Sequence, residues 1–209
     1  MKIKVCGNTV LEQLNELSNL PIDYVGLIFY PQSPRCVLQK IKANDFKQLK
    51  IPATKVGVFV NASEEEIMKQ VDEFGLEMVQ LHGDETASFC NKISDQLKVI
   101  KAFRITDIDA NVDWLVQEYD EVCDYYLFDK GSAGLYGGTG KKFDWDLLQN
   151  SAIKKPFFLS GGIGRNDVVA LKTFHHPFFY GLDVNSRFEI SPGIKNLNLI
   201  KDFAEELKN

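Results

Sequence analysis

The chain has 209 residues, of which 44% are hydrophobic and 25% are charged, a composition that excludes the disordered, collagen-like and coiled-coil classes. Its net charge of −5 argues against a broad basic surface for nucleic acid or for an anionic membrane, whereas local backbone dipoles can still bind a small phosphorylated molecule. At about 150 residues per domain, this length predicts a single domain over residues 1–209.

The N-terminal residues enter directly into strand-like alternation and lack the apolar run of a signal peptide. No segment approaches the roughly 18 consecutive apolar residues of a membrane span, so we expect a cytoplasmic protein that does not bind membranes. The cysteines are far apart and form no C-x-x-C pair, which predicts free thiols rather than a zinc site or a disulfide framework. They are Cys6, Cys36, Cys90 and Cys123.

In chain order, short runs rich in valine, isoleucine and phenylalanine alternate with longer stretches of helical period. The expected strands cover residues 3–5, 24–29, 54–59, 78–81, 99–103, 125–128, 157–160 and 178–182. The expected helices cover residues 9–18, 43–49, 63–74, 86–95, 112–118, 145–148, 166–173 and 197–207. Ser63 stands three residues before Glu66 and predicts a capping box, and Asn166 is expected to start the seventh helix.

Alternation of strands and helices implies a parallel sheet joined by right-handed crossovers, the α/β class. Eight such units predict a closed (β/α)8 TIM barrel. An open, doubly wound sheet is the alternative, because periodicity alone does not reveal closure. The first strand-to-helix turn, Cys6-Gly7-Asn8-Thr9, lacks the G-x-G-x-x-G fingerprint of many open sheets. At about 26 residues per unit (209/8), a barrel leaves little length for insertions.

Active sites of parallel barrels lie at the carboxyl ends of the strands. Cys6 ends the first expected strand and Asp129 the sixth, on nearly opposing walls, so two proton-transfer groups can flank one substrate. Read singly, Cys6 is equally a small buried hydrophobic residue and Asp129 a loop cap. Lys4 shares the face of Cys6 and is expected to favour its thiolate.

Three further residues at these strand ends are candidate substrate contacts. Arg35 lies on a proline-stiffened loop, either as a fork that grips a carboxylate or as an exposed charge. His82 follows the fourth strand and either contacts substrate or hydrogen-bonds its neighbours. Asp183, after the eighth strand, is the third candidate.

Glycine-rich turns follow the seventh and eighth expected strands. Gly161 and Gly162 would let backbone N–H groups approach a phosphate, and Asn185 and Ser186 follow the neighbouring strand. The alternative for each glycine is an ordinary turn. Their joint placement matches a recurrent phosphate site of this fold. The stretch 131–140 is also glycine-rich and is a candidate loop to order over bound ligand.

Taken together, these segments resemble phosphoribosylanthranilate isomerase. Seven motifs match in family order from residue 4 to about residue 195, which makes the resemblance specific. They are Lys4-Val5-Cys6-Gly7; Gly26-Leu27-Ile28-Phe29-Tyr30-Pro31 with Ser33-Pro34-Arg35; Val56-Gly57-Val58-Phe59-Val60-Asn61; Val79-Gln80-Leu81-His82-Gly83-Asp84-Glu85; Gly137-Gly138-Thr139-Gly140 with Phe143-Asp144-Trp145; Ser160-Gly161-Gly162-Ile163; and Gly181-Leu182-Asp183-Val184 with Glu189 and Pro192-Gly193.

The resemblance implies an isomerase of tryptophan biosynthesis that converts N-(5-phosphoribosyl)anthranilate to 1-(2-carboxyphenylamino)-1-deoxyribulose 5-phosphate by an Amadori rearrangement. It implies no metal or other cofactor, a small-molecule substrate as the only partner besides self-association (monomer or homodimer), Cys6 as general base and Asp129 as general acid. By the same similarity, Arg35 holds the anthranilate carboxylate, and the glycine turns hold the phosphate.

The chain departs from the family pattern at four places. Lys130 replaces a small hydroxylic residue after the acid, Cys36 replaces an aromatic residue, Asn185 replaces a serine, and Arg187-Phe188 replaces a glycine-containing pair. Two alternatives stay open at this point: a metal-dependent pentose-phosphate epimerase, for which only His82 is a suitably placed histidine, and a barrel that binds a phosphorylated ligand without catalysis.

Overall fold

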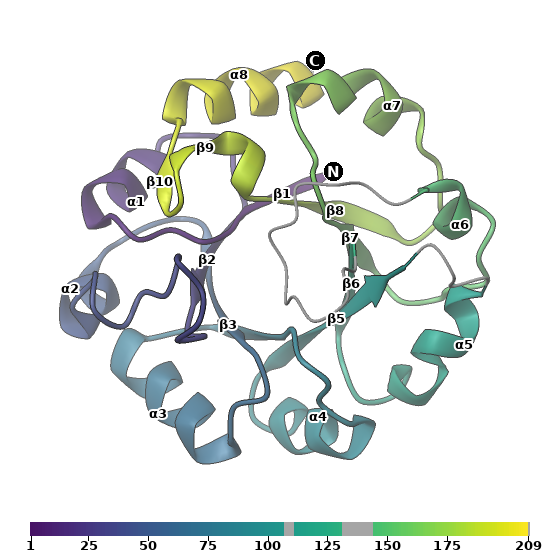
Figure 1. Cartoon of the computed structure of the whole chain (residues 1–209), viewed down its shortest axis with the longest axis horizontal. Coiled ribbons are helices and arrows are strands. Elements are labelled where there is room, and N and C mark those ends of the chain that lie inside the picture. The colour runs from purple at the N-terminus through teal and green to yellow at the C-terminus, as the bar shows by residue number, and fades with distance from the viewer. Residues whose placement is uncertain (107–110, 131–143, 209) are drawn as a thin grey trace.

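Eight parallel strands form a closed barrel inside a ring of helices, as Figure 1 shows. The structure, a computed structural model, describes residues 1–106, 111–130 and 144–208. The barrel strands are β1 (Lys2–Val5), β2 (Tyr24–Ile28), β3 (Thr54–Phe59), β4 (Met78–Leu81), β5 (Lys98–Ile105), β6 (Tyr125–Lys130), β7 (Phe157–Leu159) and β8 (Phe179–Val184). The α-helices are α1 (Leu11–Leu17), α2 (Ala43–Gln48), α3 (Glu64–Phe74), α4 (Ala87–Ser94), α5 (Val112–Val116), α6 (Asp146–Gln149), α7 (Val168–Thr173) and α8 (Leu197–Lys208).

Pairing of β1 with β8 closes the barrel. The two strands run parallel from Lys2 opposite Gly181 to Val5 opposite Val184. The other neighbours follow chain order, from β1 beside β2 to β7 beside β8. The expected TIM barrel is therefore confirmed, and the open doubly wound sheet is wrong for this chain.

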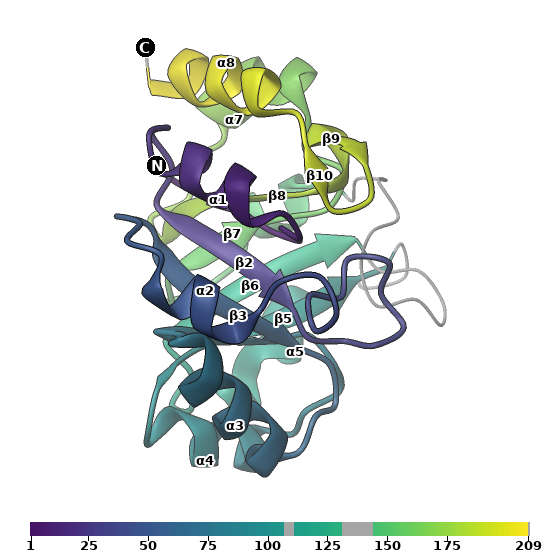
Figure 2. The same ribbon diagram turned by 90° about the vertical axis from the view of Figure 1, so that its left-hand side faces the viewer.

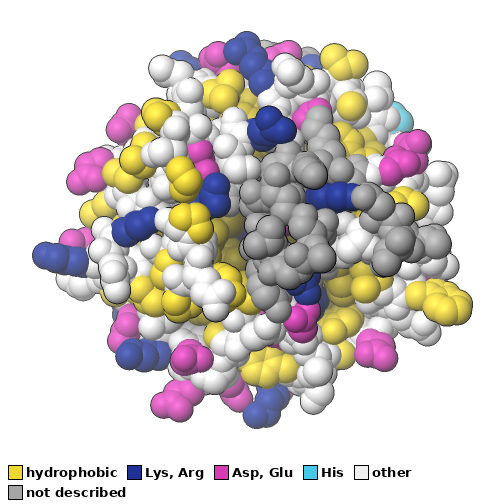
Figure 3. All heavy atoms as spheres, in the orientation of Figure 1, with side chains coloured by type: hydrophobic (Ala, Val, Ile, Leu, Met, Phe, Trp, Pro, Cys, Tyr) yellow, Lys and Arg dark blue, Asp and Glu magenta, His cyan; other side chains and the backbone are white. Residues whose placement is uncertain are grey.

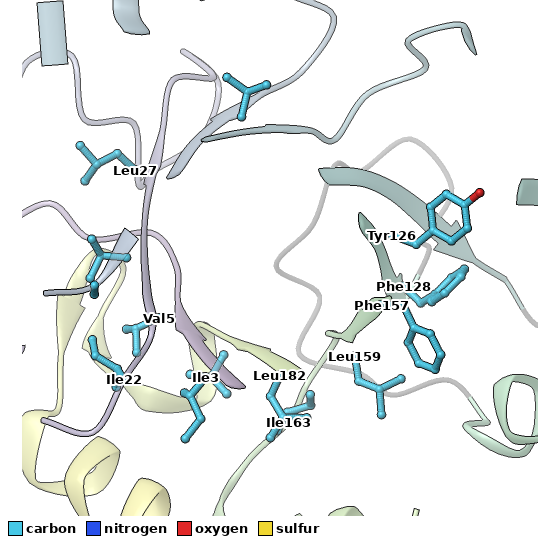
Figure 4. Packing of buried hydrophobic residues seen from close by; sticks show 14 of the residues in the cluster. Ile3, Val5, Ile22, Leu27, Tyr126, Phe128, Phe157, Leu159, Ile163 and Leu182 are labelled. Carbon is cyan, nitrogen blue, oxygen red and sulfur yellow. The ribbon is translucent and has the colours of Figure 1, made fainter. Parts of the chain in front are cut away.

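The strands send apolar side chains to both faces of the barrel wall. Residues that alternate along each strand, such as Ile3 and Val5 or Tyr126 and Phe128, pack outward against the helices (Figure 4). The residues between them point into the barrel. There, near the amino-terminal ends of the strands, a second apolar cluster fills the interior with Tyr24, Val56, Met78, Ile100, Ala102, Leu127 and Phe158.

Above this inner cluster, the inward positions become polar and remain buried. They are Lys4, Gln80, His82, Asp129, Ser160 and Asp183. In Figure 2 the strand arrows point the same way, so these residues gather at one end of the barrel, the carboxyl end of its strands. The fold thus places a polar, water-poor layer where a site is expected.

Helix starts follow the sequence at α3 and differ from it at α7. The predicted capping box is present at α3: the Glu66 N–H donates to Ser63 Oγ, and the Ser63 N–H donates to the Glu66 carboxylate. Helix α7 begins at Val168 after a turn of 3₁₀-helix, η2 (Arg165–Asp167). There Asp167 accepts from the Gly164 N–H, so Asn166 does not cap this helix.

One element lies outside the expected pattern. After β8, a 3₁₀ turn, η3 (Ser186–Phe188), leads into an antiparallel hairpin of β9 (Glu189–Ser191) and β10 (Ile194–Lys195). Phe188 is fully buried and stacks near Phe203 of α8, which anchors the turn. The hairpin stands at the carboxyl end of the barrel in Figure 2.

All four cysteines are free thiols, as expected. Within the part of the chain that the structure describes, no helix combines the length and apolar character that crossing a membrane requires.

Candidate active site

Cys6 lies directly after β1, inside the barrel mouth, and only 3% of its surface is exposed. A glycine faces it from β2, since a Cβ added at Gly26 would come within 2.8 Å of the Cys6 Sγ. Lys4, two residues earlier, points into the same interior and pairs with Asp183 at 2.8 Å. The predicted placement of Lys4 beside the thiol is therefore present.

The expected effect of Lys4 on the thiol is present, but burial outweighs it. Burial raises the pKa of Cys6, and it outweighs the ammonium groups of Lys4 and Lys195, which lower it. The Asp183 carboxylate adds to the rise. Cys6 is thus predominantly a thiol in the neutral range: Lys4 favours the thiolate, as expected, but burial, which the sequence did not show, outweighs it.

Asp129 stands near the end of β6 with 6% of its surface exposed, and β7 and β8 separate it from β1 around the ring. His82 Nε2 lies 3.4 Å from Asp129 Oδ2. On the other side of the His82 imidazole, the Gln80 amide nitrogen lies 2.8 Å from Nδ1. His82 therefore contacts the predicted acid through Nε2 and Gln80 through Nδ1. Gln80 was not predicted as a site residue.

Arg35 is fixed in place by a carboxylate. Its Nε lies 3.0 Å from both Glu189 oxygens, and its Nη2 lies 2.7 Å from Glu189 Oε2. Glu189 also accepts from Lys195 Nζ at 2.9 Å. Lys195 is buried and donates to Asn185 Oδ1 at 2.9 Å, so the hairpin joins Arg35 to the loop after β8.

The residues expected to bind phosphate lie on two adjacent loops. Gly161 (φ +86°) and Gly162 (φ +66°) follow β7 in the left-handed region that glycine adopts without strain. A Cβ at Gly161 would come within 2.7 Å of the Lys130 backbone nitrogen and 2.9 Å of Asp129 Oδ1. Asn185 and Ser186 follow β8 and are half-buried. The loop after β7 therefore adjoins the predicted acid.

A buried ion pair supports the loop that carries His82. Lys101 of β5 pairs with Glu85 at 2.9 Å, and the same lysine donates to the Gly83 carbonyl at 2.8 Å. Glu85 accepts from the backbone N–H of Gly83 and of Asn61. Lys101 and Glu85 were not predicted as site residues, because they bond mainly to backbone and to each other.

The rim of the site is mixed in charge. Figure 3, which views the molecule as Figure 1 does, shows basic, acidic and hydrophobic side chains interspersed across this face. At the end of β5, Arg104 pairs with Asp84. The described residues contain no group of three or more histidine, cysteine, aspartate or glutamate side chains arranged to hold a metal ion. The motif Gly137-Gly138-Thr139-Gly140 and the stretch 131–140 lie outside the described residues.

Known proteins are similar to this chain in sequence and in fold. A family model described as N-(5'phosphoribosyl)anthranilate (PRA) isomerase matches residues 3–206. N-(5'-phosphoribosyl)anthranilate isomerase of Parabacteroides distasonis is 39% identical over 214 residues, covering 99% of this chain and 93% of that protein.

Two solved structures are similar along the whole chain. The crystal structure of phosphoribosyl anthranilate isomerase from Thermotoga maritima is 31% identical, with a TM-score of 0.81, and covers 100% of this chain and 98% of that one. A phosphoribosyl anthranilate isomerase in complex with reduced 1-(o-carboxyphenylamino)-1-deoxyribulose 5-phosphate is 30% identical, with a TM-score of 0.76 and the same coverage.

Proposed function

The chain belongs to the N-(5'-phosphoribosyl)anthranilate isomerase family, and on that premise we propose that Cys6 and Asp129 are the base and acid of its reaction. The enzyme converts N-(5'-phosphoribosyl)anthranilate to 1-(2-carboxyphenylamino)-1-deoxyribulose 5-phosphate in tryptophan biosynthesis. The observation that carries the assignment is the pair of buried groups at the ends of β1 and β6, on different sides of one barrel mouth.

The reaction starts with a proton that Asp129 delivers to the furanose ring oxygen. The bond from this oxygen to C1 breaks, and the lone pair of the anthranilate nitrogen forms the C=N bond of an iminium ion. Asp129 ends this step as a carboxylate and must carry a proton when substrate arrives. His82 Nε2 lies 3.4 Å from Asp129 Oδ2 and has no hydrogen-bond partner among the residues that the structure describes, so the imidazole is the side chain next to this proton transfer.

Cys6 then removes the proton on C2. The electrons of that C–H bond form the C1=C2 double bond and neutralise the iminium nitrogen, which gives an enolamine with a hydroxyl on C2. Tautomerisation moves the hydroxyl proton away, places a proton on C1 and yields the ketone. The positive charge of the iminium favours the Cys6 thiolate at this step. It opposes the rise in the thiol pKa that burial and the Asp183 carboxylate cause.

Substrate binding is assigned to the same mouth. The relative with a bound ligand holds a molecule that carries a carboxylate on one end and a phosphate on the other. In this chain, Arg35 is proposed to hold the carboxylate, and the loops of Gly161-Gly162 and Asn185-Ser186 the phosphate. Asp183, paired with Lys4, is proposed to contact the sugar hydroxyls from the β8 side.

A single domain over residues 1–209, a cytoplasmic location and a monomeric or homodimeric state complete the proposal. The family match over nearly the whole chain favours the isomerase over a metal-dependent epimerase and over a barrel without catalysis.

Growth without tryptophan tests the assignment in cells. A bacterial strain that lacks its own phosphoribosylanthranilate isomerase should grow when it expresses this chain, and should not grow with Cys6→Ala or Asp129→Asn produced at the same level. Asp202→Asn, on the outer surface of α8, is the matched control and should support growth. Growth with either site variant would remove that residue from the mechanism.

A further inference from the structure

Glu189 is the centre of an ion cluster at the barrel mouth. Its carboxylate accepts hydrogen bonds from two nitrogens of Arg35, at 2.7 and 3.0 Å, from the Lys195 ammonium at 2.9 Å and from the Gly193 N–H at 2.9 Å. Neither Glu189 nor Lys195 belongs to the barrel strands, because both come from the hairpin β9–β10. The hairpin thus reaches back over the mouth to a residue 154 positions earlier in the chain.

Glu189 uses only one edge of the Arg35 guanidinium. It takes Nε and Nη2, and among the described residues Nη1 has no hydrogen-bonding partner. A guanidinium offers two edges that fit a carboxylate, so the edge formed by Nη1 and the second N–H of Nη2 is left for another carboxylate. Arg35 therefore meets Glu189 on one edge and keeps the other for a ligand.

The stem of Arg35 is held beside the catalytic strand. A Cβ on Gly7, the residue after Cys6, would lie 2.8 Å from Arg35 Cδ and 2.8 Å from Asn185 Oδ1. Gly7 has a φ of +73°, so backbone and space both require glycine there. The stem of Arg35 is consequently packed against Gly7, the residue after Cys6, with no room to shift toward it.

The charges of the cluster do not cancel. Burial would raise the pKa of Glu189, but the hydrogen bonds from Arg35 and the charge of Lys195 lower it, so the group is ionised. Burial lowers the pKa of Lys195, and the adjacent Glu189 carboxylate opposes this effect. With Lys195 protonated, two cations and one carboxylate leave a surplus of one positive charge. With Arg35 and Glu189 alone the cluster would be neutral, and an incoming carboxylate would gain much less from binding there.

Further hydrogen bonds make the hairpin a rigid support. Lys195 exchanges two hydrogen bonds with Gln13 of α1: its N–H donates to Gln13 Oε1, and its carbonyl accepts from Gln13 Nε2, both at 2.8 Å. Its ammonium also holds Asn185 in the loop after β8. The carboxylate and phosphate ends of the site thus share one support.

We propose that Glu189 and Lys195 are positioning residues that select substrates with a carboxylate on the aromatic ring: Glu189 aims the free edge of Arg35 into the site, and Lys195 supplies the surplus positive charge. The inference rests on the proposed function, in which Arg35 holds the anthranilate carboxylate. It assigns a role to the hairpin, which the repeating strand–helix pattern does not contain.

Binding of two product analogues tests this inference. One is reduced 1-(o-carboxyphenylamino)-1-deoxyribulose 5-phosphate, and the other is the same molecule without the ring carboxylate. The wild-type chain should prefer the carboxylated analogue. Glu189→Gln retains a surplus positive charge but removes the carboxylate that orients Arg35. If orientation dominates, as proposed, the carboxylated analogue should bind about tenfold or more weakly and the other less than about twofold, because only the first uses Arg35.

Steady-state kinetics give the second readout. In Glu189→Gln, KM for phosphoribosylanthranilate should rise about tenfold, while kcat changes less than about threefold, because the proton-transfer groups are untouched. Lys195→Met should also lower the preference for the carboxylated analogue. Asp23→Asn, which removes a carboxylate paired with Lys2 at the amino-terminal end of the barrel, is the matched control and should leave both constants unchanged.

A double-mutant cycle with Arg35→Lys shows whether Glu189 acts through Arg35. The effect of Glu189→Gln should largely vanish in the Arg35→Lys background, and full additivity would overturn the proposal. An unchanged analogue preference in Glu189→Gln would also overturn it. If Glu189→Gln does not fold, Glu189→Asp, which keeps the charge and shortens the reach, carries the same test.

The outcomes separate this inference from the proposed function. A wild-type chain that does not turn over phosphoribosylanthranilate contradicts the function itself. A chain that turns it over but binds both analogues equally contradicts the role of Arg35 and, with it, this inference. Turnover with a preference that Glu189→Gln retains overturns this inference alone.

Discussion

The Cys6 thiol experiences the charge of Lys4 and of Lys195, yet burial keeps its pKa above the ordinary value for cysteine. Such a group is a weak base in the free enzyme and a better one beside a cation. In the proposed mechanism, the iminium ion formed in the first step supplies that cation next to the C2 hydrogen. The proposed base would then be fully activated only after the sugar ring has opened.

This environment predicts the pH dependence of the free enzyme. Because Cys6, as the proposed base, must lose its proton to act, and its pKa is raised, kcat/KM should increase with pH from the neutral into the alkaline range. Lys4→Met removes a charge that lowers this pKa and leaves Asp183 unpaired, and both changes move the increase to higher pH. A pH–rate profile of the two proteins measures the shift.

Lys2→Met is the control, since Lys2 is exposed and pairs with Asp23 at the amino-terminal end of β1. Its profile should match that of the wild type. An increase that moves to lower pH in Lys4→Met, or one that does not move, would show that Lys4 does not act on the base.

At this scale, the sequence identified residues better than it identified their partners. Cys6, Asp129 and His82 could be placed because strand ends were recognisable and inward positions alternate. Glu189 and Lys195 were missed as partners of Arg35, because a contact across 154 residues leaves no local pattern. Lys4 does lower the pKa of Cys6, as expected, but the larger effect of burial was not predicted, because burial of an inward cysteine depends on how the whole mouth packs.

Among the helices and strands, α3 is the one whose start local sequence predicts correctly in detail. Its start could be read from Ser63 and Glu66 because a capping box is satisfied within four residues. The hairpin β9–β10 could not be predicted from local sequence. Its strands have only three and two residues, and its main hydrogen bonds run to Arg35 and Gln13, which are distant in the chain. The start of α7 also differed, because Asp167 takes the Gly164 N–H in a 3₁₀ turn.

The cap of α3 gives a prediction about stability. Ser63→Ala should lower the free energy of unfolding by about 1 kcal/mol, because the Glu66 N–H loses its partner. The Ser63 N–H and hydroxyl donate to the Glu66 carboxylate and lower the pKa of Glu66. The part of the difference that comes from the hydroxyl bond is therefore present at neutral pH and is lost as the pH falls through the acidic range. Urea unfolding at pH 7 and at pH 4 measures both effects.

Ser94→Ala is the matched control, because the Ser94 hydroxyl donates only to the Asn91 carbonyl near the end of α4. It should change the unfolding free energy by less than about 0.5 kcal/mol. Turnover should be unaffected in both variants, since both helices lie outside the barrel. Equal stability of the two variants at pH 7 would contradict the cap.

For the molecule as a whole, closure of the barrel is the feature that sequence periodicity left undecided. Eight strand–helix units fit either an open or a closed sheet, and only the register of β1 against β8 decides between them. That register places Lys4 opposite Asp183. Closure thus builds part of the site, because the ion pair beside Cys6 exists only across this seam.

Substitution of Gly181, which lies opposite Lys2, tests the seam between β1 and β8. A Cβ at this position would lie 2.5 Å from the Lys2 carbonyl oxygen, so Gly181→Ala must push β8 away from β1. The variant should lose about 1–3 kcal/mol of unfolding free energy, and its turnover should fall because Lys4 and Asp183 separate. Gly164→Ala is the stability control, since its Cβ would meet Arg187 at an ordinary 3.6 Å. Wild-type stability in Gly181→Ala would show that the seam is not tightly packed.

The most direct test of the account is the fluorescence of phosphoribosylanthranilate mixed with the purified chain. The wild-type protein should make this fluorescence decay far faster than it does in buffer, as substrate is converted to the ketose product. Cys6→Ala and Asp129→Asn should each slow the enzymatic decay by about two to four orders of magnitude. A wild-type chain that leaves the decay at its rate in buffer would contradict the assigned function, and undiminished decay with either variant would contradict the assigned acid and base.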